Sequence, residues 1–328
     1  MRSSQLFSPI TLGGIELSNR IVVAPMCQYS ADDGSATDWH LMHLGQFAVS
    51  GVGLILVEAT GVSPEARISP GCLGLWSDEN QKALTRVVRF CHDYGNATMG
   101  IQLAHAGRKA STDLPWYGGA PIPASDPRGW QTVAPSAAAY SDAFDTPTAL
   151  DDEGLAKIVD DFVAAARRAD EIGFDVVEVH MAHGYLMHQF LSPLSNQRND
   201  AYGGTLEGRM RFPLEVFAAV RAVWPKTKAL GVRISATDWV DGSSWTVEEA
   251  SRFTAALYAA GADFIDVSSG GNSPAQQIEA GPGYQTGFAA TIRREVGIPT
   301  MAVGQITEPR QAEAIPVSYT HLTLPTKA

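Results

Sequence analysis

With 328 residues, 45% of them hydrophobic, and no Ser/Gly-rich linker, the chain can bury one barrel-sized core as a single domain. Its formal net charge of −11 argues against nucleic acid or an anionic membrane surface as a partner and favours a small organic substrate. Three cysteines without a CxxC pair indicate neither a disulfide framework nor an iron–sulfur cluster. The sequence contains no run of about 18 apolar residues that would predict a membrane span, so we expect a cytoplasmic protein.

Short apolar strands alternate along the chain with amphipathic helical stretches, the pattern typical of a parallel sheet. Ahead of the first strand, Leu12–Ser18 is predicted to form a hairpin that plugs the bottom of a barrel. The predicted strands are Arg20–Ala24, Leu54–Glu58, Thr98–Leu103, Asp175–His180, Lys228–Ile234, Phe264–Val267 and Thr300–Val303. The predicted helices are His40–Val49, Glu79–Tyr94, Asp152–Ile172, Leu206–Val223, Val247–Ala260 and Phe288–Glu295.

Polar residues and glycines gather at the carboxyl end of every predicted strand. They are Pro25–Tyr29, Glu58–Thr60, His105–Lys109, His180–Tyr185, Arg233, Ser268–Asn272 and Val303–Gly304. This distribution predicts an α/β fold, a (β/α)₈ barrel whose mouth carries the chemistry. The long segment Ser111–Thr148, rich in Pro, Gly, Ala and Trp, is expected to form the rim of the active site.

The strand Asp175–Val179 leads directly into His180, His183 and Tyr185. Two imidazoles can hold a substrate oxygen while a phenol moves a proton, so these residues are candidate catalytic groups. A polar cap on the strand is the structural alternative. A metal site is a further alternative, because His105 could complete a three-histidine set for a metal-dependent barrel hydrolase, although Met181 stands where an HExxH zinc motif has its Glu.

The eighth βα unit is apparently missing. A helix begins after Thr307, but Pro316 is expected to break it, and the residues that follow supply no glycine-flanked apolar strand. We therefore expect a barrel domain over residues 1–315, incomplete at its C-terminus, and a non-native or unstructured tail over 316–328. A genuine extended tail is the alternative.

From Leu6 to Ile315 the chain resembles the old yellow enzyme family of FMN-dependent ene-reductases, and within it the thermophilic-like class that includes the xenobiotic reductases. The motifs that carry the resemblance are Asn19–Tyr29, Gln102–Lys109, His180-x-x-His183-Gly184-Tyr185, Phe190–Asn196, Asp200–Gly204 and Gly231–Arg233. The resemblance implies an NADPH dehydrogenase that reduces the C=C bond of α,β-unsaturated carbonyl compounds, with FMN as cofactor and NADPH or NADH as reductant. It also implies that the full-length parent is a homo-oligomer.

The resemblance also implies roles for individual residues. Pro25, Met26 and Ala59 would approach the isoalloxazine, Gln102 would bond its pyrimidine edge, and Arg233 would lie by N1 and the C2 carbonyl. Cys27 would contact the flavin, and Val303 with Gly304 would keep half of the phosphate site. An eighth-strand Gly-Arg that completes that site in the family has no match here, so weak FMN binding, or a non-catalytic flavin-binding fragment, is expected as an alternative.

For the reaction, the resemblance implies that His180 and His183 hold the substrate carbonyl and that Tyr185 protonates the α-carbon. Tyr29 would add a hydrogen bond or shape the pocket. Trp116 or Trp130, from the long rim segment, could form an apolar wall.

Overall fold

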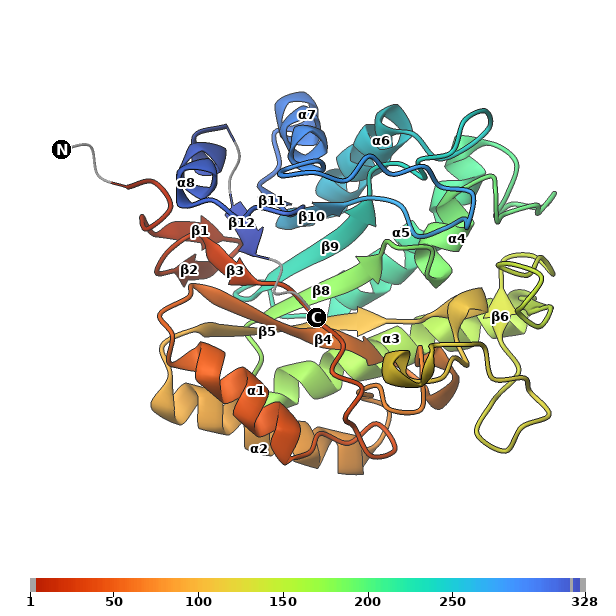
Figure 1. Cartoon of the computed structure of the whole chain (residues 1–328), viewed down its shortest axis with the longest axis horizontal. Coiled ribbons are helices and arrows are strands. Elements are labelled where there is room, and N and C mark those ends of the chain that lie inside the picture. The colour runs from red at the N-terminus through yellow and green to blue at the C-terminus, as the bar shows by residue number, and fades with distance from the viewer. Residues whose placement is uncertain (1–3, 319–320, 325–328) are drawn as a thin grey trace.

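Eight parallel strands close into a barrel in the computed structural model, which describes residues 4–318 and 321–324 (Figure 1). The strands follow one another around the barrel in chain order, and the last pairs with the first. They are β3 (Ile21–Val23), β4 (Leu54–Gly61), β5 (Thr98–Ala104), β8 (Val176–Met181), β9 (Ala229–Ser235), β10 (Phe264–Ser268), β11 (Thr300–Ala302) and β12 (His321–Leu324). All seven predicted strands and the predicted barrel are confirmed.

Helices surround the strands, with α1, α2 and α3 on one side of the barrel and α6, α7 and α8 on the other (Figure 1). They are α1 (Asp38–Ala48), α2 (Asp78–Tyr94), α3 (Asp152–Ile172), α4 (Leu186–Leu191), α5 (Leu206–Val223), α6 (Val247–Ala259), α7 (Thr286–Val296) and α8 (Pro309–Ser318). The side chains of Ser77, Asp151, Thr205 and Thr246 cap α2, α3, α5 and α6 by accepting a backbone N–H. The six predicted helices are confirmed, whereas α4 is too short to show a helical period.

The hairpin of β1 (Ile10–Leu12) and β2 (Ile15–Leu17) closes the bottom of the barrel. Leu12 and Leu17 are fully buried in a cluster with apolar side chains of the barrel strands, including Leu54 and Phe264. Leu54 and Phe264 are the first residues of β4 and β10. The hairpin therefore plugs the end of the barrel opposite the carboxyl termini of the strands, as predicted. A short parallel pair, β6 (Val133–Ala134) with β7 (Thr148–Ala149), lies in the long rim segment. Of the helices in the described residues, none combines the length and apolar character needed to cross a bilayer.

The expectation that the eighth strand is missing is wrong. Strand β12 pairs with β11 through Met301 and His321, and with β3 through Leu322 and Ile21. Without β12, the neighbouring strands β3 and β11 would leave their edge backbone groups unpaired. Such edges accept a short strand even when it has no flanking glycines. The expected barrel boundary at Ile315 therefore omits one strand. Of the expected tail, residues 319–320 and 325–328 lie outside the described residues.

The expectation that Pro316 ends the last helix is also wrong, because α8 continues through it to Ser318. A proline lacks one backbone donor and crowds the preceding turn, but the residues on either side keep their own hydrogen-bonding groups. The helix accordingly reaches close to the start of β12.

Truncating the chain after Ile315 should destabilise the barrel, because it removes the backbone pairs that β12 makes with both neighbours. At about 1 kcal/mol for each net hydrogen bond, we expect the melting temperature to fall by about 10 °C and the soluble fraction to drop. Thermal unfolding followed by circular dichroism measures the shift. Truncation after Leu324 keeps β12 and is the matched control; equal melting of both truncations and the full chain would contradict the role of β12.

Candidate active site

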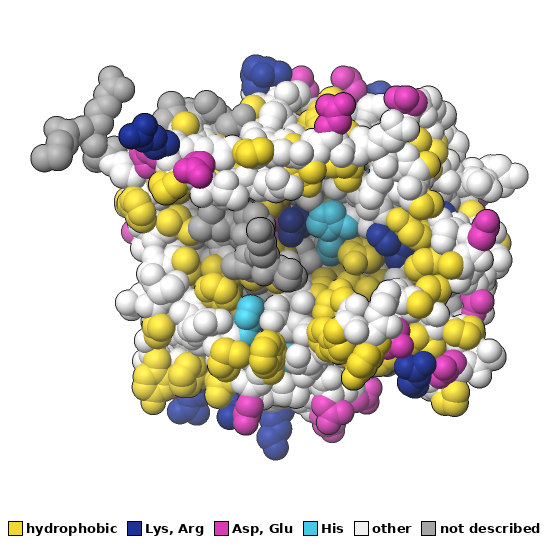
Figure 2. All heavy atoms as spheres, in the orientation of Figure 1, with side chains coloured by type: hydrophobic (Ala, Val, Ile, Leu, Met, Phe, Trp, Pro, Cys, Tyr) yellow, Lys and Arg dark blue, Asp and Glu magenta, His cyan; other side chains and the backbone are white. Residues whose placement is uncertain are grey.

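The carboxyl ends of the barrel strands meet at one mouth, where the polar residues singled out in the sequence come together. The strand register determines which of these side chains lie at the same height in the barrel. Ala59 of β4 lies beside Gln102 of β5, and Gln102 lies beside Glu178 of β8. One step nearer the mouth, His180 of β8 lies beside Arg233 of β9. The face of the molecule shown in Figure 2 has a hollow near its middle, which contains histidine and basic side chains and has apolar side chains around it.

His180, His183 and Tyr185 form one cluster, as predicted. The His180 ring lies 5.1 Å, centroid to centroid, from the rings of both His183 and Tyr185, and each pair meets edge to face. His180 is the penultimate residue of the buried strand β8, whereas His183 and Tyr185 belong to the turn that leads into α4. The strand therefore fixes one imidazole, and the turn brings the second imidazole and the phenol against it.

Hydrogen bonding fixes the tautomer of His180. Its Nδ1 accepts the N–H of Ala182 at 3.2 Å, so the ring proton of the neutral imidazole lies on Nε2. Burial, and secondarily the charge of Arg233, lowers the pKa of His180 well below its usual range. His180 therefore offers a neutral N–H donor at physiological pH.

His183 has an unusual backbone conformation, with a φ of 59° in the left-handed region. Its N–H donates to Ser235 Oγ at 2.9 Å, and its Nε2 lies 2.6 Å from Ser268 Oγ. Burial, followed by the charge of Arg233, lowers the pKa of His183 as well. A non-glycine residue persists in this conformation only where its surroundings hold it, and such residues concentrate at functional sites.

Tyr29 and the long rim segment supply aromatic walls. Tyr29 has a φ of 50°, and its ring meets Trp116 at 6.0 Å between centroids. Tyr140 of the same segment lies against Lys109 at the mouth. Trp130 is engaged elsewhere, because its Nε1 donates to Glu65 O and its ring stacks on Arg67. Of the two tryptophans proposed for a wall, Trp116 is therefore the one that contacts a candidate substrate-binding residue.

A buried polar network lies beneath the histidines. Gln102 Nε2 donates to Glu178 Oε1 at 2.7 Å, and Arg233 Nε lies 3.3 Å from Asp266 Oδ2. Burial, followed by repulsion from Asp266, raises the pKa of Glu178 to about 8. At pH 7 Glu178 is therefore mostly protonated, and the cation of Arg233 is balanced by Asp266.

These groups fit the pyrimidine edge of a flavin. Within the described residues, Arg233 Nε faces Asp266 as an ion pair without hydrogen-bond geometry, and Gln102 is bonded to Glu178 through its Nε2. A cation and an acceptor oxygen are thus available for a carbonyl and an N–H of the ligand. Ala59 keeps the neighbouring strand end small, and Pro25 with Met26 follows β3 at the same mouth.

Other residues expected at the cofactor lie at the ends of β3 and β11. Val303 and Gly304 follow β11 and are buried, and Gly304 has a φ of 125° that only glycine adopts readily. Cys27 follows β3 and is half-buried. A hydrogen bond with the buried Cys72, followed by desolvation, raises the pKa of the Cys27 thiol well above its usual range. Cys27 is therefore a neutral thiol at pH 7.

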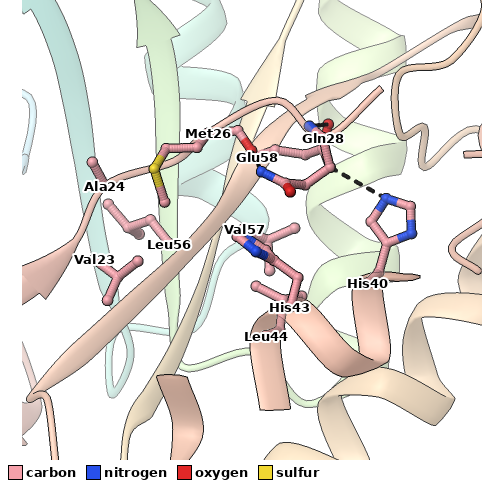
Figure 3. A pocket seen from close by; sticks show the side chains of 10 residues that line it. All are labelled: Val23, Ala24, Met26, Gln28, His40, His43, Leu44, Leu56, Val57 and Glu58. Atoms are coloured by element: carbon pink, nitrogen blue, oxygen red, sulfur yellow. Dashed lines mark hydrogen bonds and ion pairs between the residues drawn. The ribbon is translucent and has the colours of Figure 1, made fainter. Parts of the chain in front are cut away.

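Sequence reasoning gave no role to the pair of His40 and Glu58. Figure 3 shows His40 of α1 facing Glu58 of β4; His40 Nε2 lies 3.3 Å from Glu58 Oε1, and both side chains are buried. Glu58 Oε2 also accepts the N–H of Gln28 at 3.0 Å, so the pair fixes the segment that holds Cys27. A β-bulge between Val57 and Ala59 interrupts the alternation of β4 here, and a lone carboxylate in an apolar strand is the signal that could have revealed it.

The pair of His188 and Asp238 was also missed. His188 Nδ1 accepts the N–H of Gly184 at 2.9 Å, and its Nε2 lies 3.1 Å from Asp238 Oδ1, with both side chains fully buried. The pair braces the turn that carries His183. The two residues are 50 positions apart, so only the fold brings them together.

The metal-site alternative has no support in the structure. His105 Nδ1 accepts the N–H of Gly107 at 3.1 Å, and burial lowers the pKa of His105 to about 4. Among residues 4–318 and 321–324, no three His, Cys, Asp or Glu side chains form a group that could hold a metal ion.

Comparison with known proteins assigns the chain to a family. The model of the NADH:flavin oxidoreductase / NADH oxidase family matches residues 5–322. An NADPH dehydrogenase of Geobacillus thermodenitrificans is 46% identical over 313 residues, which cover 94% of this chain and 86% of the relative.

Solved structures show the same fold. Morphinone reductase superimposes with a TM-score of 0.81 at 29% identity, covering 98% of this chain and 85% of that protein. An old yellow enzyme homologue from Zymomonas mobilis superimposes with a TM-score of 0.78 at 28% identity, covering 97% and 88% of the two chains.

Proposed function

This chain belongs to the NADH:flavin oxidoreductase / NADH oxidase family, and its structure is similar to that of an old yellow enzyme homologue. We therefore propose that the mouth of its barrel binds and reduces activated alkenes. The predicted flavin-dependent oxidoreductase with FMN and a nicotinamide reductant is confirmed, and a metal-dependent hydrolase is not favoured. The observation that carries the assignment of roles is the cluster of His180, His183 and Tyr185 above Arg233.

Bound FMN would supply the hydride chemistry that links NADPH or NADH to the β-carbon of the substrate. For the chain itself, we assign the pyrimidine edge to Gln102 and Arg233 and the ring approach to Pro25, Met26 and Ala59. Cys27 would lie beside the ring as a neutral thiol. Val303 and Gly304 would contribute to the phosphate end, and the weak FMN binding expected without an eighth-strand Gly-Arg stays a prediction.

The two imidazoles would hold the substrate carbonyl. His180 would donate through Nε2–H, the tautomer that its bond from Ala182 requires. His183 would supply the second donor from its neutral imidazole, whose Nε2 lies 2.6 Å from Ser268 Oγ. Two such donors draw electrons from the β-carbon and stabilise the developing enolate oxygen.

Tyr185 would protonate the α-carbon. Burial raises the pKa of Tyr185 well above its usual range, so the phenol holds its proton until a strongly basic carbon is present. Tyr29 and Trp116 would border the substrate. The cytoplasmic location, the homo-oligomeric state and the choice between NADPH and NADH remain expectations from the sequence.

Purification with added FMN tests the proposal. The protein should retain a flavin absorption band and no stoichiometric zinc, lose that band on anaerobic addition of NADPH, and regain it with 2-cyclohexenone. Absorbance spectra and metal analysis measure these outcomes. A colourless protein with one bound zinc would favour a hydrolase, and a yellow protein that NADPH and cyclohexenone leave unchanged would favour a flavin-binding protein without this activity.

A further inference from the structure

The side chain of Lys109 ties together two backbone segments at the mouth. In η2 (Gly107–Lys109), its ammonium donates to the carbonyl oxygens of His183 at 2.8 Å and Gly271 at 2.7 Å. The two segments touch backbone to backbone there, because a Cβ on Gly184 would lie 2.2 Å from Gly271 O. Lys109 therefore binds the turn after β8 to the loop after β10 at their closest approach.

The turn that Lys109 holds is the strained one. His183 is in the left-handed region, a conformation that costs free energy unless neighbouring groups enforce it. Ser235 Oγ links the N–H of His183 to Gly270 O, so it connects the same two segments through a neutral hydroxyl. Lys109 adds a charged donor on the carbonyl side of the same residue, and charge-assisted hydrogen bonds are the stronger kind.

The same ammonium also lies against the candidate proton donor. Lys109 Nζ is 5.1 Å from the centroid of the Tyr185 ring and 4.9 Å from that of Tyr140. A cation over an aromatic face is attracted to its electron density, and a phenolate ring is richer in electrons than a phenol. Because burial disfavours a charged Tyr185, a cation at this distance matters most when the proton leaves.

We propose that Lys109 is a positioning residue of the alkene-reducing half-reaction, which holds the His183 turn and stabilises Tyr185 as it loses its proton. In that step the O–H bond of Tyr185 breaks and a C–H bond forms at the α-carbon from the electron pair of the enolate. The O–H electron pair stays on the phenolate, which water reprotonates. This inference rests on the proposed function, because it assigns a partner to the proton donor of that reaction.

The ionisation of Lys109 gives the proposal a pH signature. Burial, followed by repulsion from Arg108, lowers the pKa of Lys109 to about 8. The charge is thus present below pH 8 and lost above it. The titratable side chains that face the ammonium are Arg108, Tyr140, His180, His183 and Tyr185. Burial lowers the pKa of Arg108 only to about 10, lowers those of both histidines, and raises those of both tyrosines, so Lys109 alone among them titrates near pH 8.

The test separates the two half-reactions in FMN-loaded protein by stopped-flow absorbance. Lys109→Met keeps the apolar stem but removes the charge, and we expect oxidation by 2-cyclohexenone to slow about 10- to 100-fold while reduction by NADPH changes little. In the parent, the rate of oxidation should fall as pH rises through about 8. The Met variant should lose that limb, and Lys109→Arg should keep a rate near the parental one with the limb moved to higher pH.

A second readout follows the position of His183 without turnover. Equilibrium dialysis of 4-hydroxybenzaldehyde, whose oxygen can accept from both imidazoles, should show weaker binding to the Met variant than to the parent. Lys82→Met, at an exposed lysine of α2, is the matched control and should change none of these quantities.

The outcomes are distinguishable. A Met variant with the parental oxidation rate and an unchanged pH profile would overturn the proposal, and so would equal slowing of both half-reactions, which indicates general damage to the fold. If the Met variant fails to fold, the pH profile of the parent decides: a flat profile between pH 7 and 9 refutes the role of the charge. A parent that cyclohexenone cannot reoxidise refutes the proposed function itself, before any variant is made.

Discussion

Replacing His180 and His183 together by alanine should abolish the reduction of 2-cyclohexenone while FMN stays bound. Each imidazole can offer a neutral donor to the substrate oxygen, and removal of one such donor typically slows a reaction by about 10²–10³-fold. Loss of both removes the carbonyl site altogether, so we expect a larger decrease than either single replacement produces. Stopped-flow oxidation of the NADPH-reduced protein measures it, and the flavin absorbance at the start of each trace reports cofactor content.

The flavin should remain because its assigned contacts lie on other strands, at Gln102 of β5 and Arg233 of β9. His92→Ala, a replacement of a partly exposed histidine on α2, is the matched control. Asparagine at positions 180 and 183 keeps an N–H donor at each site and should restore part of the rate. Reduction of cyclohexenone by the double alanine variant at near the parental rate would remove both imidazoles from the mechanism.

Replacing Tyr185 by phenylalanine should slow the alkene-reducing half-reaction by about 10²–10⁴-fold, the usual contribution of a positioned general acid. Reduction of the bound flavin by NADPH should keep its rate, because that step transfers a hydride and needs no proton at carbon. The two half-reactions are measured separately in anaerobic stopped-flow experiments. Water that reaches the α-carbon would replace part of the lost proton transfer, which places the result toward the lower end of the range.

Tyr258→Phe removes a phenol from an exposed position on α6 and serves as the control. In the parent, D₂O should slow oxidation by the enone more than reduction by NADPH, and the Phe variant should lose the part of this effect that arises from the phenol. If the Phe variant slowed both half-reactions equally, Tyr185 would serve the structure of the α4 turn instead of the chemistry.

The barrel could be predicted because its signals are local. Apolar runs such as Asp175–His180 alternate with helices such as Asp152–Ile172, and each pattern is complete within one segment of chain. The ends of parallel strands necessarily meet at one edge, so the gathering of His180 and Arg233 also followed from their places in the strands. The last strand was missed because β12 carries no local signal; the unpaired edges of β3 and β11 select it.

The sequence by itself determined the fold class, the family resemblance and the identity of the candidate catalytic groups, because strand period, turn residues and contiguous motifs are encoded locally. Only the tertiary structure decided how those groups are held. The pairing of Glu58 with His40 depends on a bulge in β4, and the contacts of Lys109 with His183 and Gly271 depend on the approach of three loops. Hydrogen bonds between side chains and backbone groups far apart in the chain leave no period in the sequence, since their partners are chosen by strand register and loop packing after the barrel has closed.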